Sequence, residues 1–114
     1  MKFEMSKAGN YLIVRIGGEL DHHYCDIIRN RIDPELMEPP IRNIVFDLSG
    51  LTFMDSSGIG MLMGRLRIVK AIGGQACLIC ENPGVLRILE MSGVLNLFTR
   101  SKTISDAVKG ACVR

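Results

Sequence analysis

The sequence has little excess of either positive or negative charge. Its 114 residues carry a formal net charge of +2, and the basic residues are scattered along the chain rather than grouped. Nucleic acids and anionic membrane surfaces are bound through clustered basic residues. The composition therefore favours a protein as the partner and indicates neither a nucleic acid nor a membrane.

Long apolar runs are also missing. No segment approaches the roughly 20 apolar residues that a membrane-spanning helix needs. The first part of the chain carries charges at Lys2, Glu4, Lys7 and Arg15, unlike a signal peptide. The length suits one hydrophobic core. We expect a single domain over residues 1–114, located in the cytoplasm.

The signatures of two common enzyme classes are absent. A nucleophile elbow needs Gly-x-Ser-x-Gly, and neither Ser56 nor Ser57 has a glycine two residues before it. A phosphate-binding loop needs Gly-x-x-x-x-Gly-Lys, but Gly58, Gly60 and Gly64 have a different spacing and no lysine follows them. The sequence therefore predicts no catalytic residue and no cofactor.

Four cysteines raise the question of a metal site, because Cys77 and Cys80 have Cys-x-x-Cys spacing. Residues 75–80 read as a strand, in which residues three apart point to opposite faces, so these thiols are not expected to hold one ion. Adjacent histidines, as at positions 22 and 23, diverge on any regular element. We expect no metal site, and we expect all four cysteines, including Cys25 and Cys112, to be buried, reduced thiols.

The most informative stretch covers residues 43–70 and reads as strand, turn and helix. Residues 44–48 are rich in β-branched and aromatic side chains, which predicts a strand buried on both faces. Asp55, Ser56 and Ser57 are good N-cap residues in front of a helical pattern. A hydroxyl is therefore expected at a helix start, where unpaired N–H groups favour an anion. From these residues alone, simple capping by a serine is the more common role.

The whole pattern predicts an α/β fold with a mixed, mostly parallel sheet of about five strands, an antiparallel hairpin at its start and about four helices. Pro34 is expected to kink or break the first helix. The expected strands cover residues 3–5, 11–16, 44–48, 75–80 and 94–98, and the expected helices begin near residues 24, 57, 83 and 104, the last one running to residue 112.

A flexible acidic loop is expected at residues 17–21, Gly-Gly-Glu-Leu-Asp, before the first helix. Asp21 is expected to cap that helix, while Glu19 has no evident structural task. Loops at the carboxyl ends of neighbouring parallel strands converge, so this loop can meet the start of the second helix. The predicted shared surface contains Glu19, Asp21, Asp55 and Ser56.

The second helix has apolar residues on two sides. One side, residues 59, 62, 63, 66 and 69, is expected to face the sheet. Met61 and Ile68 fall on the opposite side, with Gly64 between them, where solvent is expected. This strip is either a contact surface or a pair of isolated exposed apolar residues, and the sequence does not decide between the two.

Two motifs together resemble the STAS domain of the anti-sigma factor antagonists. Gly-Glu-Leu-Asp-His-His at residues 18–23 follows a strand, and Met-Asp-Ser-Ser-Gly at residues 54–58 follows about thirty residues later. The match covers essentially the whole chain. Within the family, the two motifs look most like those of the sporulation members, which antagonise the anti-sigma F factor.

The resemblance implies a binding switch that is not itself an enzyme. Unphosphorylated, the protein would bind an anti-sigma factor and release the sigma factor; phosphorylation of Ser56 would end that binding and so control sporulation transcription. The anti-sigma factor would also be an ATP-dependent serine kinase, a serine phosphatase would restore the hydroxyl, and the free protein would be a monomer. The positions implied in partner binding are Gly18, Glu19, Asp21, Asp55, Ser56, Ser57, Gly58 and Met61.

Other members of the same family remain alternatives. A STAS module that binds a ligand or nucleotide, of the kind attached to transporters, is the competing class, although no membrane segment is found in the sequence. A stress-response relative of the sporulation antagonists is also compatible with the motifs. A phosphoryl carrier or a hydrolase ranks third.

Overall fold

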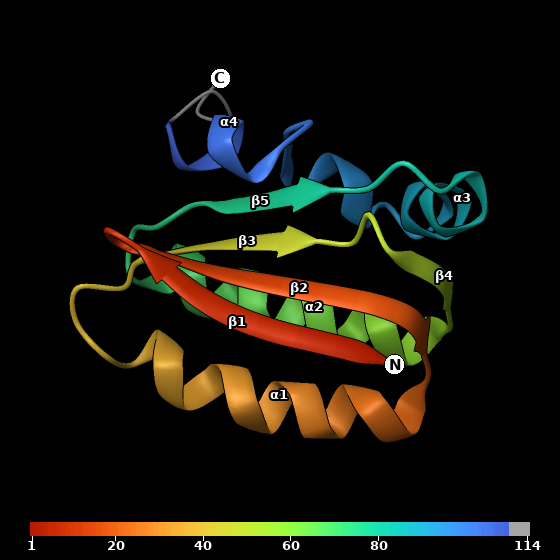
Figure 1. The fold of residues 1–114 in the computed structure, drawn as a ribbon, viewed down its shortest axis with the longest axis horizontal. Helices are drawn as coiled ribbons and strands as arrows, with labels where there is room; N and C mark the ends of the chain where they lie inside the picture. The colour runs from red at the N-terminus through yellow and green to blue at the C-terminus, as the bar shows by residue number, and fades with distance from the viewer. Residues whose placement is uncertain (110–114) are drawn as a thin grey trace.

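A β-hairpin begins the chain. In the computed structural model, which describes residues 1–109, strand β1 (Lys2–Ala8) pairs antiparallel with strand β2 (Tyr11–Leu20). Gly9 and Asn10 form the turn between them, and the predicted hairpin is confirmed (Figure 1). Both strands are longer than predicted.

The hairpin forms one edge of a mixed six-stranded sheet. The parallel strands β3 (Asn43–Asp47), β5 (Ala76–Ile79) and β6 (Thr99–Arg100) extend it in the order β1-β2-β3-β5-β6. A further strand, β4 (Leu51–Met54), pairs in parallel with the carboxyl end of β2. The predicted α/β class, with an antiparallel hairpin followed by parallel strands, is confirmed.

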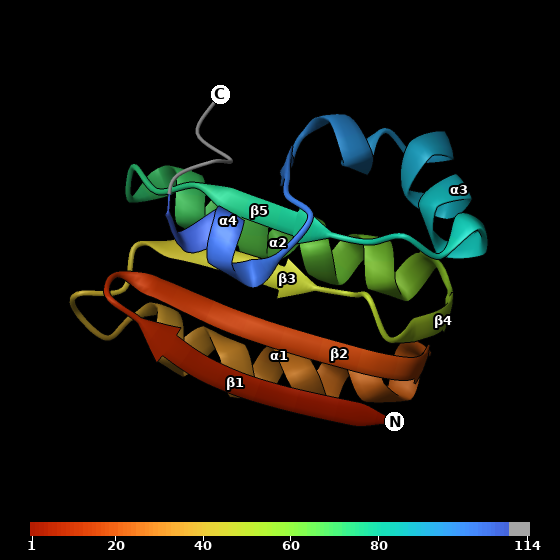
Figure 2. The ribbon, with the colours of Figure 1, turned by 45° about the horizontal axis from the view of Figure 1, so that its top comes forward.

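Helices lie on both faces of the sheet. Figure 2 shows α1 (His22–Leu36) and α2 (Ser56–Ala71) behind the strands and the short α4 (Ile104–Val108) in front of them. α3 (Pro83–Met91) contacts β4 and the 3-10 turn Val94–Asn96. None of the helices within residues 1–109 is long and apolar enough to cross a membrane.

Alternation along the strands divides the buried side chains between the two faces. In β2, Leu12 and Val14 point into the main core with α1 and α2, whereas Ile13 points to the other face. A smaller cluster on that face includes Ala107 of α4. Strand β3 is largely buried on both sides, as its apolar run predicts.

The predicted loop at residues 17–21 is wrong. Residues 17–20 continue β2, and residues 51–54, expected to belong to a turn, form β4 beside them. Along β4 the side chains are buried, exposed, exposed and buried, so the strand lacks the alternation that would reveal it in the sequence. Its pairing partner is distant in the chain, so no local pattern contains the information.

Helix α1 is also longer than predicted, because it is not broken at Pro34. It continues to Leu36 and ends with Met37 as its C-cap. A proline removes the hydrogen bond of its own N–H, but here only the last turn of the helix is affected. Packing of Ile32 and Leu36 in the core keeps that last turn helical.

The region after α3 also differs from the prediction. Residues 94–98 do not form a strand: the apolar side chains start a 3-10 turn, and the strand begins at Thr99. The last helix starts as predicted, with the Thr103 hydroxyl accepting a hydrogen bond from the Asp106 N–H at 3.0 Å. Its predicted continuation over residues 110–112 lies outside the described residues.

Cys77 and Cys80 point to opposite faces of the sheet, as predicted: Cys77 joins the smaller cluster and Cys80 the main core. Cys25 and Cys80 are free and buried. The expectation of four reduced thiols is wrong for Cys77, which is disulfide-bonded and whose side chain lies on the face away from the main core. Cys112 lies outside the described residues.

The apolar strip predicted on α2 is not exposed. Met61 is only 5% exposed, and Arg65, one turn later, is 7% exposed, because α1 packs along this side of α2. The Nε atom of Arg65 lies 2.9 Å from Oδ1 of Asp33, an ion pair that joins the two helices. Burial lowers the pKa of Arg65, and the Asp33 carboxylate opposes that shift. Ile68 packs partly buried against the main core.

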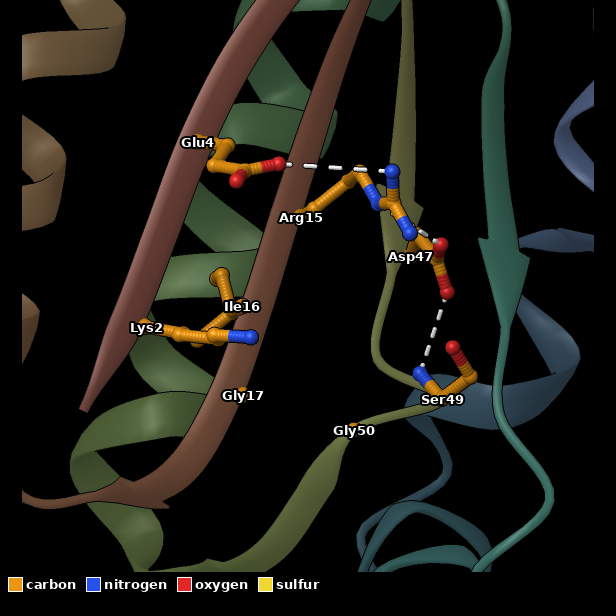
Figure 3. A pocket seen from close by; sticks show the side chains of 8 residues that line it. All are labelled: Lys2, Glu4, Arg15, Ile16, Gly17, Asp47, Ser49 and Gly50. Atoms are coloured by element: carbon orange, nitrogen blue, oxygen red, sulfur yellow. Dashed lines mark hydrogen bonds and ion pairs between the residues drawn. The ribbon is translucent and has the colours of Figure 1, made fainter.

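Three charged residues lie side by side on neighbouring strands, on the face of the sheet that points away from α1 and α2. Glu4, Arg15 and Asp47 are direct neighbours on β1, β2 and β3. Figure 3 shows Arg15 between the two carboxylates, with Nε 3.4 Å from Oδ2 of Asp47 and Nη1 4.0 Å from Oε1 of Glu4. Oδ1 of Asp47 accepts a hydrogen bond from the Ser49 N–H at 3.1 Å. This buried carboxylate is therefore paired on both oxygens and holds the chain that leads from β3 to β4.

We predict that Gly74→Ala destabilises the fold. A Cβ atom at position 74 would overlap the carbonyl oxygen of Arg42, a backbone atom before β3. The expected loss in the free energy of unfolding is about 2 kcal/mol or more, since overpacking in a filled region costs roughly 1–3 kcal/mol. Urea denaturation of the wild type and the variant measures it.

Gly64→Ala is the matched control. A Cβ atom there has no neighbour within 4 Å, and replacing a helical glycine by alanine stabilises a helix by roughly 0.5–1 kcal/mol. Equal effects of the two substitutions would contradict the steric explanation.

Candidate functional site

The carboxyl end of β2 and strand β4 leave the sheet side by side. Glu19 pairs with Phe53 and Leu20 pairs with Met54, and the Asp55 N–H donates to the Leu20 carbonyl at 3.4 Å. Each strand then runs directly into a helix, β2 into α1 and β4 into α2. Two helix N-termini are therefore held next to each other at one end of the sheet (Figure 1).

A carboxylate caps each of these helices. Oδ1 of Asp21 accepts a hydrogen bond from the Tyr24 N–H at 3.1 Å, and Oδ1 of Asp55 accepts one from the Ser57 N–H at 2.9 Å. Negative charge at a helix N-terminus is favourable because it meets the positive end of the helix dipole. The prediction for Asp21 is confirmed, whereas at α2 the cap is Asp55 and neither serine.

The two adjacent serines have different surroundings. Ser56 is the first residue of α2 and is exposed, and its hydroxyl has no hydrogen-bond partner within residues 1–109. Ser57 is half-buried, and its hydroxyl shares a hydrogen bond of 3.1 Å with Nδ1 of His22 on α1. One hydroxyl is thus free at the surface, and the other is tied to the neighbouring helix.

Two of the residues predicted to bind a partner are buried. A Cβ atom at Gly58 would overlap the side chain of Met54, so this glycine allows the first turn of α2 to lie against β4. Met61 is covered by α1, as described above. Both residues therefore pack beneath the site and contribute little to its exposed surface.

Gly18 connects the main sheet to the site. Its φ of 89° lies in the left-handed region that favours glycine, and a register shift occurs between it and Glu19. Its N–H donates to the Gly50 carbonyl at 2.9 Å, and its carbonyl accepts from the Thr52 hydroxyl at 3.1 Å. The exposed part of the predicted surface therefore consists of Glu19, Asp21 and Ser56, together with the partly buried Asp55.

The carboxylates of the site also affect the pKa of Cys25, which lies one turn into α1. Burial raises the pKa of its thiol to about 11, and the carboxylates of Asp55 and Asp21 add to the shift. At neutral pH the thiol is protonated, so Cys25 acts here as a small buried apolar residue.

Two residues at the site were not predicted from the sequence. His22 is the exposed first residue of α1, and its contact with a serine 35 positions away is one that no local signal could reveal. Phe53 is 47% exposed beside Glu19, an unusual position for a phenylalanine. Its exposure follows from the irregular burial pattern of β4, which no local signal in the sequence shows.

A metal centre is the other kind of site that these residue types could form. Within residues 1–109 there is no group of three or more His, Cys, Asp or Glu side chains that could hold a metal ion. The chemistry present is that of carboxylates, two hydroxyls and an imidazole at two helix starts.

Comparison with known proteins places this arrangement in a family. Residues 2–111 match the STAS domain. The anti-sigma F factor antagonist of Paenibacillus polymyxa is 39% identical over 97 residues, which cover 85% of this chain and 83% of that protein. The anti-sigma F factor antagonist of Lysinibacillus sphaericus is 36% identical over 83 residues, covering 73% of this chain and 71% of that one.

The fold agrees with solved structures of the same class. The anti-sigma factor antagonist SpoIIAA in its unphosphorylated form superposes with a TM-score of 0.86 at 28% identity, covering 99% of this chain and 98% of that one. The Bacillus cell fate determinant SpoIIAA in its phosphorylated form gives a TM-score of 0.78 at 29% identity, covering 99% and 100%. The chain therefore belongs to the STAS domain family and, within it, to the anti-sigma F factor antagonists, which are regulators and not enzymes.

Proposed function

We propose that this protein is a phosphorylation-controlled switch that binds an anti-sigma F factor in its unmodified form and releases it when Ser56 is phosphorylated. The observation that carries the proposal is the Ser56 hydroxyl, which is exposed and has no hydrogen-bond partner within residues 1–109. It belongs to the first residue of α2, at the Asp55-capped helix start that lies next to the Asp21-capped start of α1. Binding would free the sigma factor and allow sporulation transcription.

Ser56 is the better phosphate acceptor of the two serines on geometric grounds. Phosphoryl transfer depends mainly on positioning, so the acceptor oxygen has to reach the γ-phosphate of ATP in line with the leaving oxygen. The Ser56 hydroxyl is exposed, whereas the Ser57 hydroxyl points towards His22. The assignment of Ser56 agrees with the position that the family motif implies.

The proposed binding surface combines the end of β2 with the start of α2. Glu19, Asp21 and Asp55 give it negative charge, and the Ser56 hydroxyl can donate or accept a hydrogen bond. A partner that fits it presents basic and hydrogen-bonding groups here. Gly18 and Ser57 lie within the same surface, whereas Gly58 and Met61 support it from the core.

Phosphorylation would act by changing this surface directly. A phosphoserine carries about 1.5 to 2 negative charges at neutral pH. At position 56 the phosphate would meet the first N–H groups of α2, which favour an anion, so the helix can keep its structure. A partner surface fitted to a neutral hydroxyl would meet added bulk and a charge to desolvate, and would dissociate.

The switch requires two further activities that come from other proteins. We assign the kinase activity to the anti-sigma factor itself, which would use ATP, and the return to the hydroxyl form to a separate serine phosphatase. The free antagonist would act as a monomer and as one domain over residues 1–114.

We predict that Ser56→Ala cannot be phosphorylated and binds the anti-sigma F factor constitutively. Because Asp55 and not Ser56 caps α2, the free energy of unfolding should change by less than about 0.5 kcal/mol, as at most exposed positions. Incubation with an anti-sigma F factor and ATP, followed by mass spectrometry, measures the modification. Phosphate at full stoichiometry on Ser56→Ala would show that Ser56 is not the acceptor.

A second prediction concerns the acidic residues. Glu19→Gln and Asp21→Asn should weaken binding of the anti-sigma factor while thermal stability stays nearly constant, since asparagine also caps helices. Glu38→Gln, beyond the far end of α1, is the matched control and should change neither quantity. Calorimetric titration and thermal unfolding separate the effects, and parallel losses of binding and stability would assign the carboxylates to the fold.

A third prediction is that phosphorylation stays local. NMR shift changes between the two forms should be confined to residues 18–23 and 53–62, because the phosphate adds to a helix start that already favours anions. Ser56→Asp should bind the anti-sigma factor much more weakly than the wild type, although one carboxylate only partly imitates a phosphate. Shift changes that spread into α4 would instead indicate a conformational switch.

A further inference from the structure

Adjacent serines at the start of α2 raise a question of selectivity, because a kinase that reaches Ser56 also comes close to Ser57. Both hydroxyls belong to the first turn of α2. The backbone gives the two serines the same electrostatic environment, since both residues lie at the positive end of the helix dipole. The described contact that distinguishes the two hydroxyls is the 3.1 Å hydrogen bond between Nδ1 of His22 and Oγ of Ser57.

The partial burial of Ser57 does not by itself prevent its phosphorylation. A cavity of about 340 Å³ opens between α1 and α2 directly beside it, lined by His22, Ser57, Gly60 and Met61 among others. Gly60 contributes no side chain, and a Cβ atom there would meet nothing within 4 Å. The same cleft is lined by Arg29 and Arg65, which are already paired with Asp26 at 3.0 Å and with Asp33 at 2.9 Å. There is therefore room for a phosphoryl group on Ser57, so lack of space does not explain why Ser57 would stay unmodified.

We propose that Ser57 is a latent second phosphorylation site and that His22 is the positioning residue that keeps it unmodified. This inference rests on the proposed function, and it adds the residue that selects between the two serines. The hydrogen bond turns the Ser57 oxygen towards α1, so the oxygen is not aligned with the γ-phosphate when the kinase engages the exposed start of α2.

The chemical step is the same for either serine. The serine oxygen forms a bond to the γ-phosphorus of ATP, and the bond between that phosphorus and the oxygen bridging to the β-phosphate breaks. ADP leaves, and the hydroxyl proton passes to a base that the kinase supplies. Because transfer of this kind depends on alignment more than on activation of the hydroxyl, the orientation of Oγ decides which serine reacts.

The experiment uses the full chain with an anti-sigma F factor and ATP, and it locates phosphate by mass spectrometry. Wild type should carry phosphate on Ser56, and Ser56→Ala should show only a background rate of phosphorylation on Ser57. In Ser56→Ala/His22→Ala, that rate should rise about tenfold over its value in Ser56→Ala, the factor that corresponds to one hydrogen bond of roughly 1.4 kcal/mol.

Two control variants separate the hydrogen bond from other roles of the histidine. Ser56→Ala/His22→Asn should return Ser57 to low phosphorylation, because an asparagine amide group can take the place of Nδ1. Ser56→Ala/His23→Ala should behave as Ser56→Ala, because His23 contacts the Tyr24 ring and makes no hydrogen bond to Ser57. Thermal unfolding verifies that all variants are folded.

A kinase-independent measurement tests the contact itself. The nitrogen NMR shifts of the His22 imidazole should change in Ser57→Ala and stay constant in Ser56→Ala; unchanged shifts in both would overturn the inference. It would also be overturned by phosphate on Ser57 of the wild type, or by a Ser57 that stays unmodified in Ser56→Ala/His22→Ala while wild type is modified on Ser56. A wild type that accepts no phosphate would instead refute the proposed function.

Discussion

The pairing of β4 with the carboxyl end of β2 is the interaction on which the site depends. β2 pairs with β3 as far as Arg15, and from Gly18 onward it pairs with β4 instead. The β2–β4 pairing therefore extends the sheet beyond the carboxyl end of β3. The hydrogen bond from the Asp55 N–H to the Leu20 carbonyl continues this pairing to the last residue before α2. Without it, the starts of α1 and α2 would be two unrelated helix ends; with it, they form one surface.

The packing of α1 against α2 determines which residues of that surface are available. Met61 and Arg65 are covered by the neighbouring helix, and the ion pair between Arg65 and Asp33 holds the two helices in place. Ser56, the first residue of α2, remains exposed. In the proposed switch, this arrangement would let a modification at the exposed hydroxyl leave the packed helices below it unchanged.

The use of carboxylates as helix caps has two consequences here. Asp21 and Asp55 stabilise α1 and α2 through hydrogen bonds to the Tyr24 and Ser57 N–H groups. Together with Glu19 they also make the surface acidic before any phosphate is added. In the proposed switch, phosphorylation would therefore strengthen a negative charge that is already present, and its largest effect would fall on a bound partner instead of on the helix.

Much of the fold and part of the site follow from the sequence. The hairpin, the buried strand β3, the opposite orientation of Cys77 and Cys80, the cap at Asp21 and the family motifs are local patterns, because they depend on alternation, helix-start residues and turn residues within a few positions. These patterns also contain the acidic residues and Ser56 of the candidate site.

The tertiary structure alone decided the remaining features, since each depends on residues far apart in the chain. Strand β4 exists because Leu51 and Met54 pair with β2, Met61 is buried because α1 packs over it, and α1 continues past Pro34 because Leu36 is held in the core. The difference between the two serines has the same origin. Ser56 and Ser57 are chemically identical neighbours in the sequence, and only the approach of His22 from another helix gives them different environments.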